Sequence, residues 1–174
     1  MVIWLTGLSG SGKTSISMHL LPLLRMKYGA VIHIDGDIIR EIFGNDLAYD
    51  VGSRIKQVKR IQTLAKFISS ENIGVLVSAL YSSPELLAWN RRNFSGYVEV
   101  FVKAPLEVLI QRDTKGLYSK VFGKYQENVV GVDIEWVPPI NPSLVIDTTI
   151  GLPEDAAIRI VEKIDQIGLP ILKF

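Results

Sequence analysis

Cysteine is absent from the 174 residues of the chain, which excludes disulfides, thiolate catalysis and cysteine-ligated zinc or iron–sulfur clusters. No apolar run approaches the ~18 residues that a membrane-spanning helix needs, and the first residues lack the charged segment that opens a secretory signal. The formal net charge is only +1, so no electrostatic surface for nucleic acid or anionic membrane is expected. We therefore expect a soluble, cytoplasmic protein with a small-molecule partner, and the sequence leaves a homodimer open.

Residues 7–14 form a complete Gly-x-x-x-x-Gly-Lys-Thr phosphate loop. The glycines of such a loop let backbone N–H groups turn inward around phosphates, Lys13 reaches the outer phosphates, and the hydroxyl of Thr14 can hold Mg²⁺. An apolar β-type run, Val2–Thr6, precedes the loop, and helical spacing from Ser15 to Met26 follows it. Pro22 is expected to kink or shorten that helix. The motif predicts binding of a nucleoside polyphosphate, ATP, through Gly7, Leu8, Ser9, Gly10, Ser11, Gly12, Lys13 and Thr14.

Five apolar runs alternate with helical patterns along the chain. This alternation predicts one domain over residues 1–174 with an α/β phosphate-loop kinase fold, in which a mainly parallel five-stranded sheet carries helices on both faces. Periodicity is lost from residue 113 to 139, and such a long connection in a compact domain is usually functional. We therefore expect a lid over about residues 112–139. The other four predicted strands are 30–34, 73–77, 97–102 and 143–147, and the later helices are 38–43, 53–70, one from Pro84, one from Pro105, and 153–167.

The second strand leads into Asp35-Gly36-Asp37. In an open α/β sheet the carboxyl ends of the strands face the ligand crevice, so Asp37 is placed to meet an acceptor hydroxyl or a magnesium-bound water. The alternative is that Asp37 caps the next helix, and the two roles are compatible. His33, inside the strand, has no second histidine nearby, so we expect it to be packed or exposed rather than a metal ligand.

Several segments together resemble the adenylylsulfate kinase family, whose members move the γ-phosphate of ATP to the ribose 3′-hydroxyl of adenosine 5′-phosphosulfate. The resemblance implies ATP and Mg²⁺ as cofactors and a place in sulfate assimilation. The Arg-Asp-x-Lys-Gly-Leu-Tyr segment at 112–118 is far more specific to this family than the phosphate loop. The resembling segments are 3–10, 35–37 with Arg40, 101–108, 111–113, 115–118, 131–133 and 141–148.

The same resemblance implies roles for individual residues. Asp37 lies beside the acceptor hydroxyl, Arg40 and Arg54 hold the anionic end of the acceptor, and Tyr49 stacks on its base. Arg112 lies against the adenine of ATP. The acceptor-binding residues implied in this way are Asp37, Arg40, Tyr49, Arg54, Gln57, Lys115 and Val132.

The sequence departs from the family in the acceptor pocket. Tyr49 replaces the usual Phe, Gln57 replaces the usual Asn, and residues 129–132 read Val-Val-Gly-Val in place of Phe-Thr-Gly-Ile. The family's Ser-Pro dipeptide is also disturbed: counted from Ala79, Ser82 takes the place of the serine, whereas residues 83–84 keep the dipeptide with one residue inserted. We take Ser82 as the catalytic candidate beside Lys13 and Asp37.

These features lead to one hypothesis with two alternatives. The hypothesis is phosphoryl transfer from Mg-ATP to a nucleotide, catalysed by positioning and charge, with the lid excluding water. The first alternative is another acceptor such as cytidine diphosphoramidate, because the loss of an aromatic face and the longer amide at Gln57 favour a base smaller than adenine. The second is a non-catalytic nucleotide-binding switch, which would not need an acceptor aspartate and a long basic lid.

Overall fold

A computed structural model describes residues 1–113, 116–122 and 127–169 of the protein. Its centre is a sheet of five parallel strands in the order β2-β3-β1-β4-β5, as the alternation of apolar runs predicts. Each strand begins within one residue of its predicted start. The strands are β1 (Val2–Thr6), β2 (Val31–Asp35), β3 (Gly74–Ala79), β4 (Tyr97–Lys103) and β5 (Leu144–Asp147).

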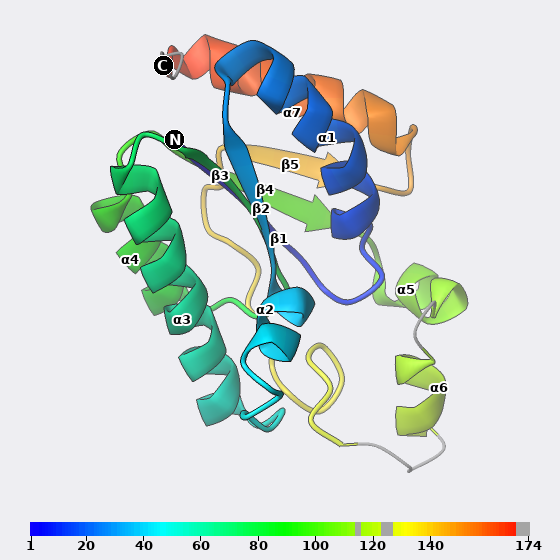
Figure 1. The fold of residues 1–174 in the computed structure, drawn as a ribbon. Helices are drawn as coiled ribbons and strands as arrows, with labels where there is room; N and C mark the ends of the chain where they lie inside the picture. The colour runs from blue at the N-terminus through cyan, green and yellow to red at the C-terminus, as the bar shows by residue number, and fades with distance from the viewer. Residues whose placement is uncertain (114–115, 123–126, 170–174) are drawn as a thin grey trace.

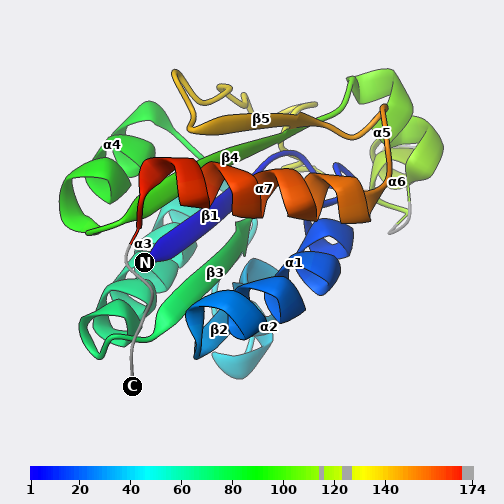
Figure 2. The same ribbon diagram turned by 90° about the horizontal axis from the view of Figure 1, so that it is seen from above.

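Two pairs of long helices cover the two faces of the sheet (Figures 1 and 2). Helices α1 (Lys13–Tyr28) and α7 (Pro153–Ile167) lie on one face, and α3 (Val51–Ser70) and α4 (Pro84–Asn93) lie on the other. Because side chains alternate along a strand, Ile3 and Leu5 of β1 enter the first core while its Val2 and Trp4 enter the second. All five residues of β1 are buried, as expected for a parallel strand covered on both faces.

Three short helices lie at the carboxyl edge of the sheet (Figure 1). They are α2 (Gly36–Ile42), α5 (Leu106–Arg112) and α6 (Leu117–Phe122). The register places Asp35 beside Ser78, and Thr6 beside both Ala79 and Phe101. The phosphate loop after β1 and the acidic segment after β2 therefore open at the same edge.

The segment expected to be an irregular lid contains the helix α6 and a small core of its own. Leu109, Tyr118 and Val129 form that core, and the Tyr118 hydroxyl donates to the Ser9 carbonyl at 3.0 Å. This segment is thus attached to the phosphate loop. The helix was missed because six residues are too few to show a periodic pattern.

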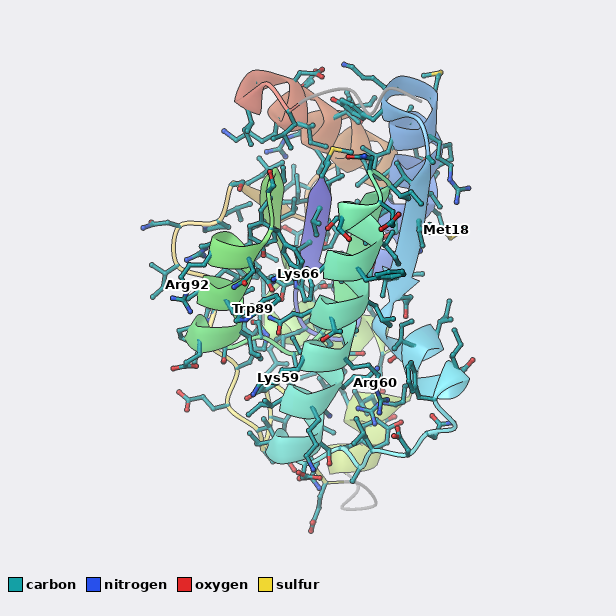
Figure 3. All side chains as sticks on the ribbon, turned by 60° about the vertical axis from the view of Figure 1, so that its left-hand side comes forward. Met18, Lys59, Arg60, Lys66, Trp89 and Arg92 are labelled. Atoms are coloured by element: carbon teal, nitrogen blue, oxygen red, sulfur yellow. The ribbon has the colours of Figure 1, made fainter. Side chains whose placement is uncertain are left out.

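Pro22 does not shorten α1, which continues past it to Tyr28, so that part of the expectation was wrong. A proline cannot donate to the carbonyl four residues before it, here that of Met18. The side chain of Met18 is 71% exposed and lies on an outer surface of the molecule (Figure 3), where water can bind the carbonyl. Among the described residues, no helix has the length and apolar character needed to cross a membrane.

Candidate active site

The phosphate loop has a conformation that its glycines make possible. A Cβ on Gly7 would lie 2.2 Å from the Val102 carbonyl oxygen of β4, so a side chain cannot fit where the loop leaves the sheet. Gly12, which precedes α1 directly, has a φ of 98°, in the left-handed region that glycine adopts without strain. The loop therefore passes close to β4 and then delivers the N-terminus of α1 to the carboxyl edge.

The ammonium group of Lys13 lies inside this loop. It donates to the carbonyl oxygens of Gly7 at 2.7 Å and Leu8 at 2.8 Å, and the Ser11 hydroxyl is 3.5 Å away. The first amides of a helix have no partner within the helix, and its N-terminus carries partial positive charge. A phosphate placed here would meet a cation and a helix N-terminus together.

A cavity of about 450 Å³ opens in front of the loop. One wall is the loop with the first turn of α1, including Thr14, and the opposite wall is residues 146–153 with Arg112. Arg112 donates to the hydroxyl and carbonyl of Thr148 at 3.0 and 2.7 Å. The Thr148 hydroxyl in turn donates to the Ser11 carbonyl at 2.9 Å. The guanidinium is thus linked through Thr148 to the phosphate loop.

A second cavity, of about 370 Å³, lies between α2, α3 and the end of β3. Arg40, Tyr49, Arg54 and Gln57 all line it, so the structure brings together four residues that the sequence assigns to the acceptor. The two cavities share a boundary, and Asp37 is the ionisable side chain there. The boundary residues are Ser9, Gly36, Asp37 and Leu80.

Asp37 is not the N-cap of α2. The cap is Asp35, whose side chain accepts from the Asp37 N–H at 2.9 Å. The alternative role considered for Asp37 is therefore wrong, because the helix begins at Gly36 and Asp37 is already inside it. Asp37 lies one step further, in the first turn of the helix, at the boundary between the two cavities.

The two arginines of the second cavity lie around one aromatic ring. The guanidinium carbon of Arg40 is 4.6 Å from the centre of the Tyr49 ring, and that of Arg54 is 5.6 Å from it. Arg54 also donates to the carbonyls of Tyr49 at 2.8 Å and Asn128 at 2.7 Å. Burial, followed by repulsion from Arg40, lowers the pKa of Arg54. Two cations held this close favour an anion between them.

Three other residues considered from the sequence, Ser82, Val129 and Val132, lie away from this cluster. Ser82 is 3% exposed and lines neither cavity, and its hydroxyl has no hydrogen-bond partner among the described residues. Ser83 is the N-cap of α4, so Ser82 is the serine that the helix does not use. Val132 is exposed and lines neither cavity, Val129 is buried in the lid core, and Lys115 lies outside the described residues.

Sequence reasoning missed a chain of polar contacts beside the first cavity. Ser78 lines that cavity, and its hydroxyl lies 2.8 Å from the Ser17 hydroxyl and 3.0 Å from His33 Nε2. His33 is partly buried, and burial lowers its pKa. Ser78 could not be recognised because it lies within the apolar run of β3, where nothing in the pattern indicates a partner.

Comparison with known proteins identifies the family of the chain. The family described as adenylylsulphate kinase matches residues 1–147 of the chain. The chain belongs to the adenylylsulfate kinase family. It is therefore an ATP-dependent phosphotransferase with a hydroxyl acceptor, and it has the phosphate-loop kinase fold that the sequence predicts.

Its relatives include enzymes with two kinds of name. The chain is 35% identical over 168 residues to an adenylyl-sulfate kinase from Rippkaea orientalis (97% of this chain, 93% of the relative). It is 43% identical over 138 residues to a cytidine diphosphoramidate kinase from Campylobacter jejuni (79% of this chain, 81% of the relative). The solved adenylylsulfate kinase of Mycobacterium tuberculosis, in complex with AMPPNP and APS, superposes with a TM-score of 0.85 at 28% identity, covering 94% of this chain and 96% of that one.

Proposed function

We propose that the protein transfers the γ-phosphoryl group of ATP to the ribose 3′-hydroxyl of an anionic nucleotide, most simply adenosine 5′-phosphosulfate. One observation carries this proposal. Asp37 lies at the boundary of a cavity with a phosphate loop and a cavity with two arginines. A carboxylate between a phosphoryl donor and an anion-binding pocket is placed to orient an acceptor hydroxyl and accept its proton.

ATP would bind in the first cavity, with its phosphates against the loop. Lys13 would exchange its carbonyl partners for phosphate oxygens, which form stronger, charge-assisted hydrogen bonds. The ammonium group would then neutralise charge that develops on the transferring phosphoryl group. The adenine would lie toward Arg112, at the far end of this cavity.

The acceptor would bind in the second cavity, with its base near Tyr49 and its anionic end between Arg40 and Arg54. This position directs the ribose toward Asp37. The reaction then needs no covalent intermediate, because both substrates are held in line and charge is stabilised in place. The Tyr118 contact with the phosphate loop supports a lid that excludes water from the transfer.

The chemistry of the first cavity also fits Mg²⁺. The hydroxyl of Thr14 and the carboxylates of Asp35 and Asp37 line it, and hard oxygen atoms are the ligands that Mg²⁺ prefers. Within the described residues, no group of three or more His, Asp or Glu side chains could hold a metal. Thr14, phosphate oxygens and water would therefore supply most of the ligands. Bound Mg²⁺ would neutralise phosphate charge in the transition state.

A second acceptor, cytidine diphosphoramidate, is favoured by one specific observation. The relative with that name is 43% identical to this chain, and Tyr49 and Gln57 depart from the usual family residues at the base-binding side. The two acceptors share an anionic end that Arg40 and Arg54 suit equally. The base alone would distinguish them.

The test is ATP consumption measured with each acceptor and without any. We expect turnover only when an acceptor is present, a product carrying one added phosphoryl group by mass spectrometry, and no turnover with a 3′-deoxy acceptor. Turnover of ATP that is independent of acceptor, or none with either nucleotide, would contradict the proposal. A nucleotide-binding switch would bind ATP yet consume none in response to an acceptor.

A further inference from the structure

The peptide unit that leads into Asp37 is held by side chains at both of its polar atoms. Its N–H, on Asp37, donates to the Asp35 carboxylate at 2.9 Å. Its carbonyl oxygen, on Gly36, accepts from the side-chain amide of Gln57 at 3.0 Å. A Cβ on Gly36 would lie 3.4 Å from the Ser78 carbonyl oxygen, so this peptide also packs directly against β3. The orientation of Asp37 is therefore fixed from α3 as well as from β2.

Gln57 is held in turn by Arg60 of its own helix, which forms an ion pair with Asp46. Its side-chain oxygen accepts from Arg60 at 3.1 Å, which determines which end of the amide faces Gly36. Arg60 also makes two hydrogen bonds to the Asp46 carboxylate, at 3.0 and 2.7 Å. Its guanidinium carbon lies 4.1 Å from the centre of the Phe43 ring. Arg60 thus joins α3 to the loop that follows α2.

The burial of Gln57 favours one orientation of its side-chain amide. Gln57 is 6% exposed, so its amide would lose hydrogen-bond energy in any orientation that left Gly36 or Arg60 without it. The hydrogen bond to Arg60 lowers the pKa of Asp46. The contacts run from Asp46 through Arg60 and Gln57 to the Gly36–Asp37 peptide.

We propose that Gln57 and Arg60 are positioning residues for Asp37, and that Gln57 acts on the reaction through the Gly36 carbonyl rather than by reading the acceptor base. The inference rests on the proposed function, because it takes Asp37 as the group that meets the acceptor hydroxyl. Positioned groups lose efficiency steeply with small displacements, and about 1 Å can cost on the order of 10²-fold in rate. Loss of the hydrogen bond from the Gln57 amide to Gly36 would allow Asp37 to move by a distance of that order.

The decisive experiment is a double-mutant cycle between Gln57 and Asp37. Gln57→Met keeps the length of the side chain and removes both hydrogen bonds. In the wild-type background we expect kcat to fall roughly tenfold or more, with the KM values for ATP and acceptor nearly unchanged. In the Asp37→Asn background the same change should lower kcat by less than about twofold, because its effect passes through Asp37.

A second pair of variants tests Arg60 with a matched control. Arg60 lies on the side of α3 that faces α2, whereas the exposed Lys59 lies on the other side of the helix (Figure 3). Arg60→Met should lower kcat in the same direction as Gln57→Met, and Lys59→Met, which also removes one positive charge, should not. Arg60→Lys keeps the charge but cannot reach Asp46 and Gln57 with one planar group, so we expect it to behave like Arg60→Met.

The possible outcomes separate the two proposals. If Asp37→Asn turns over as fast as the wild type, the proposed function itself is wrong. If Asp37→Asn is slow but Gln57→Met is not, or if Gln57→Met raises the acceptor KM equally in both backgrounds, Gln57 is not a positioning residue and the inference fails. Equal unfolding midpoints of the variants and the wild type confirm that a loss of kcat is not a loss of folded protein.

Discussion

The two cavities that meet at Asp37 are built in different ways. The first is made largely of backbone: a glycine loop, the N-terminus of a helix and main-chain carbonyls that hold Lys13. The second is made of long side chains on α2, α3 and the loop between them. Three of these, Arg40, Arg54 and Gln57, already bind parts of the protein. A backbone site is fixed by the path of the chain, whereas a side-chain site depends on every partner remaining in place.

The largest effect is expected in the first cavity. Lys13→Ala should abolish turnover and leave the unfolding midpoint close to that of the wild type. The substitution removes the cation directed at the transferring phosphate, while glycine geometry and packing hold the loop. Acceptor-dependent ATP consumption measures turnover, and thermal unfolding of the same preparation measures the midpoint. Near-normal turnover in Lys13→Ala would mean that the loop is not the donor site.

The next largest effect is expected where the two cavities meet. Asp37→Asn should lower kcat by on the order of 10²-fold or more, because it removes a positioned base while keeping the size of the side chain. The KM for ATP should change little, since the phosphate loop holds that substrate. Asp35→Ala is a useful comparison, because it removes the cap of α2 and should lower stability. If Asp37→Asn changed stability but not kcat, Asp37 would have only a structural role.

The contrast between the cavities also explains how much the sequence could predict. The loop at 7–14 and the alternation of strands and helices are patterns of residues close together in the chain, so the fold class was predictable. The carbonyl to which Gln57 donates is distant from it in sequence: Gly36 is 21 residues away. No local pattern encodes that pairing, and the amide expected to contact a base donates to a carbonyl instead.

Val129 illustrates the same limit. Its replacement of the family's Phe predicts an acceptor pocket that lacks one wall, but the side chain lies in the lid core with Leu109 and Tyr118. In this structure the change alters packing below the lid rather than the lining of the second cavity. The argument for a smaller base therefore depends on Tyr49 and on the acceptor panel.

A smaller effect is expected at Tyr49, which is 51% exposed and whose ring centre lies 4.6 and 5.6 Å from the guanidinium carbons of Arg40 and Arg54. Tyr49→Ala should raise the acceptor KM about fivefold, since aromatic stacking and cation–π contacts are each worth on the order of 1 kcal/mol. Tyr49→Phe keeps the ring and should resemble the wild type. Steady-state kinetics at saturating ATP measure both. An unchanged acceptor KM in Tyr49→Ala would place the base elsewhere.

The smallest effect concerns a side-chain contact beside the first cavity. It tests whether that cavity depends on the backbone alone. His33 reaches Ser78, which lines the first cavity. Burial lowers the pKa of His33 from its usual 6.5, with Asp35 opposing that shift and Arg25 adding to it. The unfolded chain therefore binds a proton at a higher pH than the folded protein does. As the pH falls from about 7 through the lowered pKa, the free energy of unfolding should decrease.

His33→Gln should remove part of that decrease and leave the free energy of unfolding at pH 8 nearly unchanged, because glutamine can still form a hydrogen bond but cannot titrate. Urea unfolding between pH 5 and 8 measures the slope. His19→Gln removes the other histidine of the chain and is the matched control. If His19→Gln flattens the curve and His33→Gln does not, the acid sensitivity arises at α1 and α7, where His19 contacts Glu154. If His33→Gln flattens it, a titratable side chain two strands from the phosphate loop supports the donor cavity, which is then not a purely backbone site.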